Sequence, residues 1–262
     1  MILLLSVLIA GSLPTYLPAE DVHYGIGTWD AGTYGTHRAV IHVSRKAYAV
    51  WIHLPWRRRD QNPQDKEIIV VDGLTGTRIP NVFRAEVNRE FGDLVFQPQS
   101  VPADYYVYFL PYVTSGRPNY PIVTYLKPGD TTRSEWLAQW GLRPEQDSAR
   151  IWRHLPQAEL VEFQSIDEFN SFSPMELIAT ADELKGLLTQ QRTNACLLFP
   201  EDRRFPIRMT EDLPYRWIQR GPQDTFQGEA MQGEFYAFQV GVYAPYKRIS
   251  DLRVRLGDLK GN

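Results

Sequence analysis

Short apolar segments recur about every ten residues in the first half of the chain, and this spacing is compatible with few fold classes. In HRAVIHV, apolar and polar residues alternate, which places Ala39, Ile41 and Val43 on one face of a strand. Gly, Pro and Asp separate the segments, as they do in turns. We therefore predict an antiparallel β-sandwich or jelly roll over residues 21–130.

The same alternation predicts further strands in this domain. Shorter strands are expected in EIIVVD, NVFRAEVNR and DLVFQP. In DYYVYFL, alternate aromatic residues fall on opposite faces, and each face is apolar enough to be core. In AYAVWIHLPW, one face of the strand carries Tyr48, Val50, Ile52 and Leu54.

Residues 131–199 change from strand patterns to helix patterns. Thr132 and Glu135 have the spacing of a capping box before a short helix, and Gly141 is a typical helix stop. The segment SPMELIATADELKGLLTQ predicts a longer helix, with Ser173 as N-cap, Pro at N1 and Glu at N3. AELVEFQSI and ACLLF have strand patterns. We predict a small helix-containing segment here.

The stretch PEDRRFPIRMTEDLPYRW, residues 200–217, combines many charges and prolines with apolar side chains. Its prolines favour an extended chain and limit disorder. Phe205, Ile207 and Met209 alternate with polar residues, which indicates that one side packs on protein. We predict an ordered, docked connector rather than a flexible tether.

Residues 218–262 contain two strand patterns, 235–242 and 252–256, after which the chain stops. Two strands are marginally stable alone. We expect them to begin a second β-sandwich whose remainder is missing, which would make the chain the front of a longer protein. The predicted fold class is therefore mainly β with a helical segment (α+β).

The N-terminus, MILLLSVLIAGSLPTYLPAE, has an apolar run that is too short to cross a bilayer as a helix. The small residues Ala10, Gly11 and Ser12 suit a cleavage site, although the segment has no Lys or Arg. A buried strand is the alternative. We favour a signal peptide over residues 1–20, an exported mature chain (periplasmic, cell-surface or secreted) and no membrane span after cleavage.

Charge and cysteine content argue against several classes of protein. The net charge is −3 and the pI is about 6.0, which disfavours a nucleic-acid partner because phosphate binding needs a basic surface. The single cysteine, Cys196, permits no internal disulfide and lies in an apolar run typical of a buried thiol. The histidines lack metal-ligand spacing, and no glycine-rich phosphate loop leads into a helix. We expect neither a metal nor a cofactor.

The adjacent acids Asp167 and Glu168 follow a predicted strand and precede the predicted longer helix. A paired-carboxylate mechanism requires one acid to stay protonated in its surroundings. The alternative is a solvated pair of loop acids near a helix N-terminus. We keep the two acids as catalytic candidates and favour the loop interpretation.

Two groups of residues are candidates for ligand binding. PWRRRD places Arg57, Arg58 and Arg59 at a strand end after Trp56, where the arginines would rim a site for a saccharide or carboxylate. The alternative, which we favour, is a charged strand end that discourages edge pairing. Together with Trp56, the residues Tyr106 and Tyr108 would form an aromatic sugar platform. Aromatic residues on strands are more often core, so we favour core packing for this set.

Several phrases occur together in the chain: PWRRRD, GDLVFQP, YYVYFLPY, IDEFNSFSPMELIATA, LLFPEDRRFPIRMTEDLPYRWI and GEFYAFQVGVYA. They resemble the N-terminal, non-catalytic region of exported glycosidases of the glycoside hydrolase family 123 type, from about Trp29 to Leu256. That family contains β-N-acetylgalactosaminidases. The resemblance implies β-sandwich modules before a (β/α)₈ barrel, whose adjacent Asp–Glu pair supports cleavage assisted by the substrate's acetamido group. This chain ends before any barrel, so that role is not carried onto Asp167 and Glu168.

The resemblance implies an accessory region, inactive alone, of a glycosidase that acts on N-acetylhexosamine-containing glycans. Its expected partners are a glycan or polysaccharide and the C-terminal catalytic barrel of the same polypeptide. The residues leave two alternatives open. One is a stand-alone carbohydrate-binding module with an aromatic platform, and the other is a structural surface interaction domain.

Overall fold

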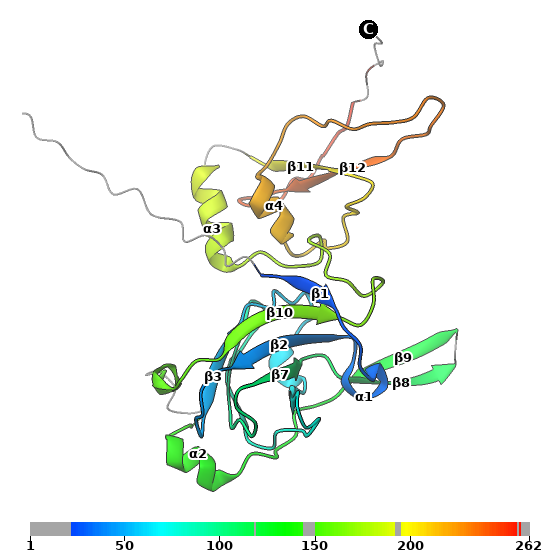
Figure 1. Cartoon of the computed structure of the whole chain (residues 1–262). Coiled ribbons are helices and arrows are strands. Elements are labelled where there is room, and N and C mark those ends of the chain that lie inside the picture. Colours follow the sequence, from blue (N-terminus) through cyan, green and yellow to red (C-terminus); the bar gives the residue numbers. More distant parts are fainter. Residues whose placement is uncertain (1–21, 118, 144–149, 192–194, 256, 258–262) are drawn as a thin grey trace, which may run out of the picture.

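The computed structural model describes residues 22–117, 119–143, 150–191, 195–255 and 257. The expected signal peptide therefore lies outside the described residues. The fold is mainly β with few helices, which confirms the predicted α+β class. Two packed sheets form a sandwich, and a smaller layer of helices and strands lies beside it (Figure 1). We call residues 173–243 the C-terminal layer.

The larger sheet of the sandwich has the strand order β1-β10-β2-β7-β4. β1 pairs with β10 in parallel, and the other neighbours are antiparallel. β10 comes from the segment AELVEFQSI, so this sheet extends beyond residue 130, where the sequence placed the end of the sandwich. The strands are β1 Tyr24–Ile26, β2 His37–Val43, β4 Ile69–Asp72, β7 Ala103–Tyr108 and β10 Glu159–Ser165.

The smaller sheet has the order β3-β6-β5 and faces the larger sheet across the main core. Ala39, Ile41 and Val43 of β2 lie in this core as predicted, together with Ile52 of β3. Tyr48 was expected on the same face as Ile52, but it precedes β3 and is exposed. The strands are β3 Val50–Leu54, β5 Val82–Val87 and β6 Gly92–Phe96.

Two short helices cover the outer face of the smaller sheet. They are α2 (Ser134–Trp140) and the 3₁₀ helix η3 (Ile151–His154). Trp136 of α2 and Trp152 of η3 belong to a second core. Phe83 of β5 and Val95 of β6 lie in the same core. The sandwich therefore buries both faces of its smaller sheet, and the first part of the predicted helix-containing segment, with α2 and η3, belongs to it.

The start of α2 differs from the prediction. Its N-cap is Arg133, which makes no side-chain cap bond. The hydroxyl of Thr132 instead donates to the carbonyl oxygen of Val82, at 2.8 Å. The Thr132 hydroxyl, which the predicted capping box needed at the helix start, is therefore bonded to the edge of β5. Gly141 ends the helix at φ 65°, as the sequence indicated.

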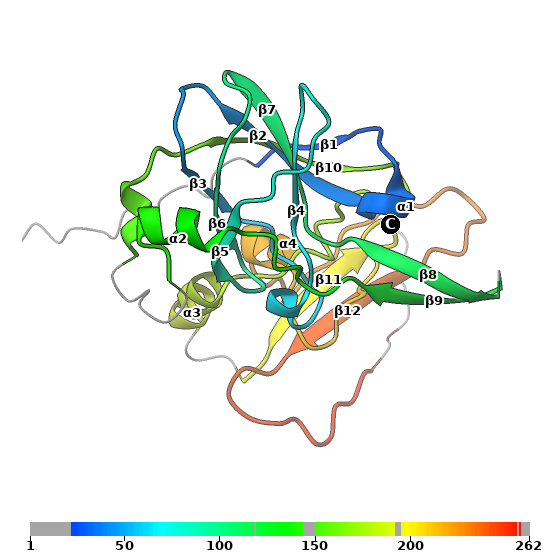
Figure 2. The same cartoon turned by 90° about the horizontal axis from the view of Figure 1, so that it is seen from below.

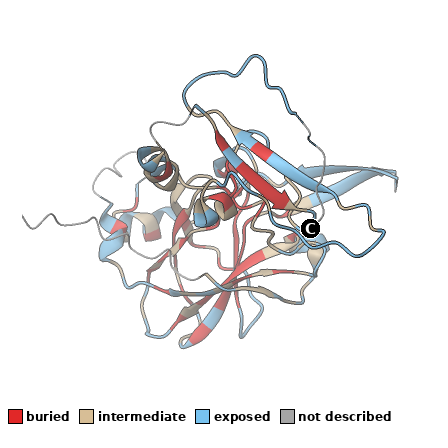
Figure 3. Ribbon diagram, turned by 90° about the horizontal axis from the view of Figure 1, so that it is seen from above, coloured by how far each residue is buried: buried red, intermediate tan, exposed pale blue. Residues whose placement is uncertain are grey.

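A β-hairpin projects from the sandwich (Figure 2). It consists of β8 (Tyr112–Arg117) and β9 (Tyr120–Tyr125), and nearly all of its described residues are exposed. Figure 3 shows the contrast with the interior of the two sheets, where buried residues are concentrated. Two other short elements lie on the sandwich, namely α1 (Ala31–Tyr34) and the 3₁₀ helix η1 (Pro63–Asp65).

The C-terminal layer has a core of its own. β11 pairs with β12 in antiparallel fashion, and Phe199 of β11 stacks on Trp217 of α4 with 4.4 Å between ring centroids. Met175, Leu187, Leu197 and Leu213 complete the buried cluster. The elements of this layer are α3 Ala181–Gln190, β11 Leu197–Asp202, α4 Tyr215–Arg220 and β12 Phe238–Tyr243.

The longer helix begins later than predicted. The N-cap of α3 is Thr180, not Ser173, and Thr180 forms a capping box with Glu183. In the preceding stretch, the backbone N–H of Ile178 donates to the carbonyl oxygen of Arg57, at 3.2 Å. Hydrogen bonds to distant segments therefore replace the helical bonds that the sequence pattern favoured.

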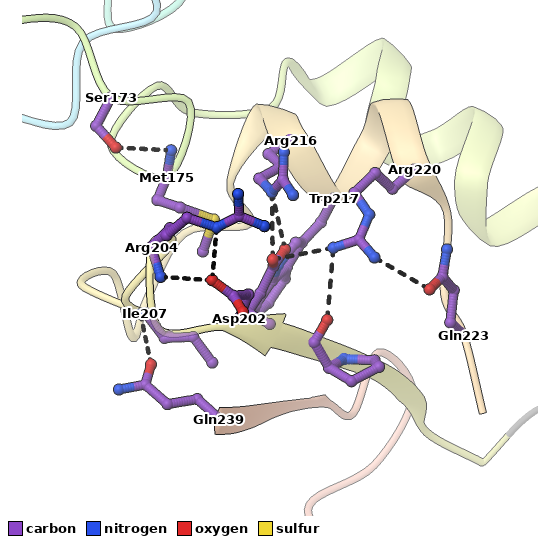
Figure 4. Close-up of polar contacts among 12 residues, drawn as sticks. Ser173, Met175, Asp202, Arg204, Ile207, Arg216, Trp217, Arg220, Gln223 and Gln239 are labelled. Atoms are coloured by element: carbon purple, nitrogen blue, oxygen red, sulfur yellow. Dashed lines mark hydrogen bonds and ion pairs between the residues drawn. The ribbon is translucent and has the colours of Figure 1, made fainter. Parts of the chain in front are cut away.

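Residues 200–217, predicted as a connector, form part of β11, a loop and the beginning of α4. Phe205 and Ile207 pack against the core of the C-terminal layer, and Met209 is buried. In Figure 4, the side chains of this stretch and of α4 point toward β11. The stretch thus lies inside one packed layer instead of between two separate bodies.

One of the two strands predicted after residue 217 is present. It corresponds to β12, which begins at Phe238. The described residues 251–255 form no strand, which corrects the second prediction. The reason is that β12 finds its partner earlier in the chain, in β11, with Leu197 opposite Tyr243. The described part of this region is therefore a strand pair with helices against one face.

Gly92 at the start of β6 allows a close approach of Trp56. An added Cβ would lie 2.2 Å from Cη2 of the indole ring, which is rigid and 2% exposed. We expect Gly92→Ala to lower the free energy of unfolding by about 1–3 kcal/mol in urea titrations. The matched control is Gly257→Ala, because nothing lies within 4 Å of that site. Equal stability of both variants would contradict this packing account.

Candidate functional site

A groove of about 540 Å³ lies between the sandwich and the C-terminal layer. One wall is the loop after β3, residues 56–60, and another is the loop after β10, residues 169–173. Glu176 and Arg208 contribute from the C-terminal layer. We call this cavity the interlayer groove. The fold thereby brings PWRRRD next to segments more than a hundred residues away.

Trp56 is built into the sandwich core at the base of this loop. It is 2% exposed, and its indole N–H donates to the carbonyl oxygen of Asn88 at 2.9 Å. Its ring lies 5.5 Å from that of Phe109. A buried ring has no open face on which a sugar can stack, which corrects the platform role considered for Trp56. Its role is to fix the loop that carries the arginines.

Arg57 joins the sandwich to the C-terminal layer. It adopts φ 48° and makes a bidentate ion pair with Glu183, with both N–O distances at 2.7 Å. Its guanidinium also lies 3.9 Å from the ring centroid of Tyr215. Burial alone would lower the pKa of Arg57, but the Glu183 carboxylate raises it above the ordinary value. A second interlayer pair, Arg89 with Asp212, lies nearby.

The Arg57–Glu183 pair should couple the two layers energetically. Both side chains are mostly buried and bidentate, so a double-mutant cycle with Arg57→Ala and Glu183→Ala should give a coupling energy of about 0.5–3 kcal/mol. The same cycle on the exposed pair Arg253–Asp251 is the control, where about 0–1 kcal/mol is expected. Both cycles are read from urea unfolding. A larger coupling in the exposed pair would contradict the interlayer role.

Arg58 lies deeper in the groove wall than Arg57. Its guanidinium stacks over Trp56 and Phe109, at 4.9 and 5.5 Å from the ring centroids. Its Nε and Nη2 donate to the two carboxylate oxygens of Asp60, at 2.9 and 2.8 Å. The remaining nitrogen, Nη1, is buried and has no hydrogen-bond partner within the described residues. Such a buried, unpaired donor is rare in folded proteins.

The rim of the groove carries two further arginines that share one carboxylate. Nη1 of Arg59 and Nη1 of Arg208 lie 2.9 and 3.0 Å from the same oxygen of Glu176. Both arginine side chains are about half exposed. The rim therefore presents guanidinium groups that keep free donor capacity toward solvent.

The loop after β10 is shaped by Asp167. This carboxylate accepts hydrogen bonds from the backbone N–H and the side-chain amide of Asn170, both at 2.8 Å. The backbone N–H of Asn170 is the main cause of a pKa of Asp167 below its usual value. Glu168 is exposed beside it. A paired-carboxylate mechanism needs a raised pKa, so this loop geometry supports the structural interpretation of Asp167.

His37 fixes the other side of the same loop. Its Nε2–H donates to the carbonyl oxygen of Asn170 at 2.8 Å, and its ring packs against Phe172. Burial lowers the pKa of His37, so the ring is neutral at neutral pH. Phe169, two residues after Asp167, is 96% exposed at the edge of the groove.

Residues 27–166 match the family model for the N-terminal domain of glycoside hydrolase 123. The chain belongs to glycoside hydrolase family 123. The match spans more than half of the chain and covers nearly the whole sandwich, from before α1 to the end of β10. No curated protein and no solved structure matches the chain. The chain is thus an accessory, N-terminal region of a glycoside hydrolase.

The family-123 N-terminal domain supplies one wall of the interlayer groove. The arginine loop, residues 56–60, lies inside the matched span, whereas Asp167 and Glu168 follow its last residue directly. Phe169, Glu176 and Arg208 were not predicted from the sequence. Phe169 and Glu176 lie on the stretch between β10 and α3, Arg208 lies after β11, and no local motif indicates that they meet the arginine loop.

Tyr106 and Tyr108 lie on the outer face of the larger sheet, away from the residues that line the groove. Tyr108 is buried and stacks on Tyr34, with 4.4 Å between ring centroids. The guanidinium of Arg38 lies between Trp29 and Tyr106, at 4.5 and 3.8 Å. The structure therefore does not bring these tyrosines together with Arg57 and Arg58. The predicted ligand-binding residues form two separate groups.

A second cavity, of about 710 Å³, lies beside β3 and β10. His53 lines it and its Nδ1–H donates to Asp93 at 2.6 Å, while Asp93 itself is fully buried. Trp51 and Arg153 also line this cavity. The sequence did not indicate the His–Asp contact, because it depends on the antiparallel register of β3 with β6.

Two further properties concern the described part of the chain. Among its helices, none has the length and apolar character needed to cross a bilayer. Its histidine, cysteine and acidic side chains form no cluster of three suited to holding a metal ion.

Proposed function

We propose that this chain is the N-terminal accessory region of an exported glycosidase that acts on N-acetylhexosamine-containing glycans, and that its interlayer groove contacts the glycan. The match of residues 27–166 to the N-terminal domain of family 123 is the observation that carries this proposal. Catalysis belongs to a (β/α)₈ barrel of the same polypeptide, against which the sandwich region docks.

The groove has the composition that a sugar site needs. Pyranose rings combine apolar C–H faces with hydroxyl groups, so their sites pair aromatic side chains with polar groups that fix orientation. Phe169 is exposed at the groove edge, and Arg59, Arg208 and Glu176 supply hydrogen-bonding groups beside it. Among the described residues of its wall, the second cavity, beside β3, has no Phe, Tyr or Trp side chain as exposed as Phe169.

Phe169→Ala should weaken glycan binding by about tenfold, because stacking of an aromatic ring on a ligand contributes on the order of 1 kcal/mol or more. Isothermal titration with an N-acetylgalactosamine-containing disaccharide measures this effect. Phe235→Ala is the matched control, since Phe235 is equally exposed but lies outside the groove. Equal affinity of wild type and both variants would exclude stacking on Phe169.

The chain alone should not hydrolyse an aryl N-acetyl-β-D-galactosaminide. The lowered pKa of Asp167 supports this expectation, because an ionised carboxylate is no proton donor. Hydrolysis by the purified chain that disappears on Glu168→Gln would overturn the accessory role.

Export rests on the apolar and small-residue pattern of residues 1–20. Expression in a Gram-negative host, followed by mass spectrometry of the periplasmic protein, tests it. A mature N-terminus between residues 13 and 21 is expected. Retention of the intact N-terminus in the cytoplasm would contradict export.

A further inference from the structure

We propose that the interlayer groove is selective for an acidic sugar, whose carboxylate or sulfate accepts hydrogen bonds from Arg58, Arg59 and Arg208. This inference rests on the proposed glycan contact and narrows its ligand class. Carboxylate and sulfate share the chemistry that matters here, namely oxygen atoms with negative charge at the spacing of a guanidinium fork.

The first step of the argument is the unsatisfied nitrogen of Arg58. The whole side chain is 2% exposed, and two of its three nitrogens are already held by Asp60. Nη1 is buried without a partner within the described residues, although Arg58 lines the groove. Leaving a buried charged donor unpaired is costly, so an acceptor that reaches it gains this energy.

The second step is the charge of the lining. Of the described residues that line the groove, four are arginines and two are carboxylates: Arg57, Arg58, Arg59, Arg208, Asp60 and Glu176. Each carboxylate is already shared between two cations. Asp60 also binds Lys66, and Glu176 is divided between two arginines. A cationic ligand would find no free carboxylate there, whereas an anion meets spare donors.

The third step is the non-polar part of the groove. His37 is neutral because burial lowers its pKa, so it adds no charge that would repel or attract a ligand. Phe109 and Trp56 close the deep end behind Arg58. Phe169 stands exposed at the edge. Such walls suit the C–H face of a sugar and strengthen an ion pair by excluding water.

The test compares two disaccharides that differ in one group. They are β-D-glucuronosyl-(1→3)-N-acetyl-D-galactosamine and its neutral analogue, in which glucose replaces glucuronic acid. Isothermal titration at low salt should give about tenfold tighter binding of the acidic disaccharide. Arg59→Gln/Arg208→Gln should abolish this preference, so that the acidic and the neutral disaccharide bind this variant with equal affinity. Arg58→Lys should also reduce it, because an ammonium group cannot reproduce the fork.

The matched control is Arg45→Gln/Arg117→Gln, which removes the same charge from exposed arginines outside the groove. It should retain the preference for the acidic disaccharide. If the control loses the preference equally, only the overall charge matters and the proposal is wrong. Equal binding of both disaccharides to wild type would overturn the acidic-sugar inference but leave the glycan contact standing. Binding of neither would overturn both.

Discussion

Trp217→Ala should unfold the C-terminal layer and leave the sandwich folded. Trp217 is 5% exposed, stacks on Phe199 and fills the space above Gly241, where a Cβ would meet its ring at 2.2 Å. Truncating a buried tryptophan lowers the free energy of unfolding by about 3–5 kcal/mol. A small two-stranded layer cannot lose this much and stay folded. Hydrogen exchange should lose protection over residues 197–243 while β2 and β7 keep theirs.

Phe235→Ala is the control for this experiment, because Phe235 belongs to the same layer and is fully exposed. It should leave hydrogen exchange unchanged throughout. Loss of protection in β2 and β7 on Trp217→Ala would show that the two layers unfold as one unit. That result would contradict separate cores.

Glu201→Ala should destabilise the same layer by about 1–3 kcal/mol, because it leaves the buried indole N–H of Trp217 without its acceptor and removes the shared partner of two partly exposed arginines. Glu201 is 1% exposed and accepts from Arg220 at 2.9 Å and from Arg216 and the Trp217 indole at about 3.1 Å. These donors converge on β11 from one face of α4 (Figure 4). The measurement is the urea midpoint followed by tryptophan fluorescence.

Glu201→Gln keeps an acceptor oxygen and should lose less stability than Glu201→Ala. Glu229→Ala, at an exposed position of the same layer, should stay within about 0.5 kcal/mol of wild type. If Glu201→Ala proves as stable as Glu229→Ala, the carboxylate does not organise α4 against β11.

The sandwich could be predicted because strand alternation is a local signal. Ala39, Ile41 and Val43 face the core as their spacing indicated. The start of α3 could not be predicted in the same way. Ser173 carries every local mark of an N-cap, yet residues 174–176 form only a turn, and the backbone N–H of Ile178 then bonds to Arg57 of the arginine loop instead of continuing a helix. Tertiary contacts outweighed a strong local pattern.

In residues 200–217 the local pattern was a correct guide, but the long-range strand pairing around it could not be predicted. The sequence showed that Phe205 and Ile207 pack on protein, and they do. It could not show that β11 would begin before this stretch and pair with β12 after it. That long-range pairing makes the stretch an internal part of a layer, and it also explains why residues 251–255 are not needed as a strand partner.

The candidate site was visible in part. PWRRRD marked the arginine loop correctly as a polar strand end, and Arg58 indeed lines a cavity. The sequence could not separate Arg57, which is used for an ion pair with Glu183, from Arg58, which keeps a free nitrogen. Nor could it show that Tyr106 lies on another face, because the order of strands in the sheet decides this.

The most direct test of the glycan contact is an NMR titration of the isotopically labelled chain with an N-acetylgalactosamine-containing disaccharide. The account predicts shifts of backbone amides in residues 56–60 and 169–177 and of the side-chain Nε–H signals of Arg59 and Arg208. Signals of Tyr106 and its neighbours on the outer face of the larger sheet should not move. Shifts confined to that outer face, or to the cavity beside β3, would contradict the interlayer groove as the glycan site.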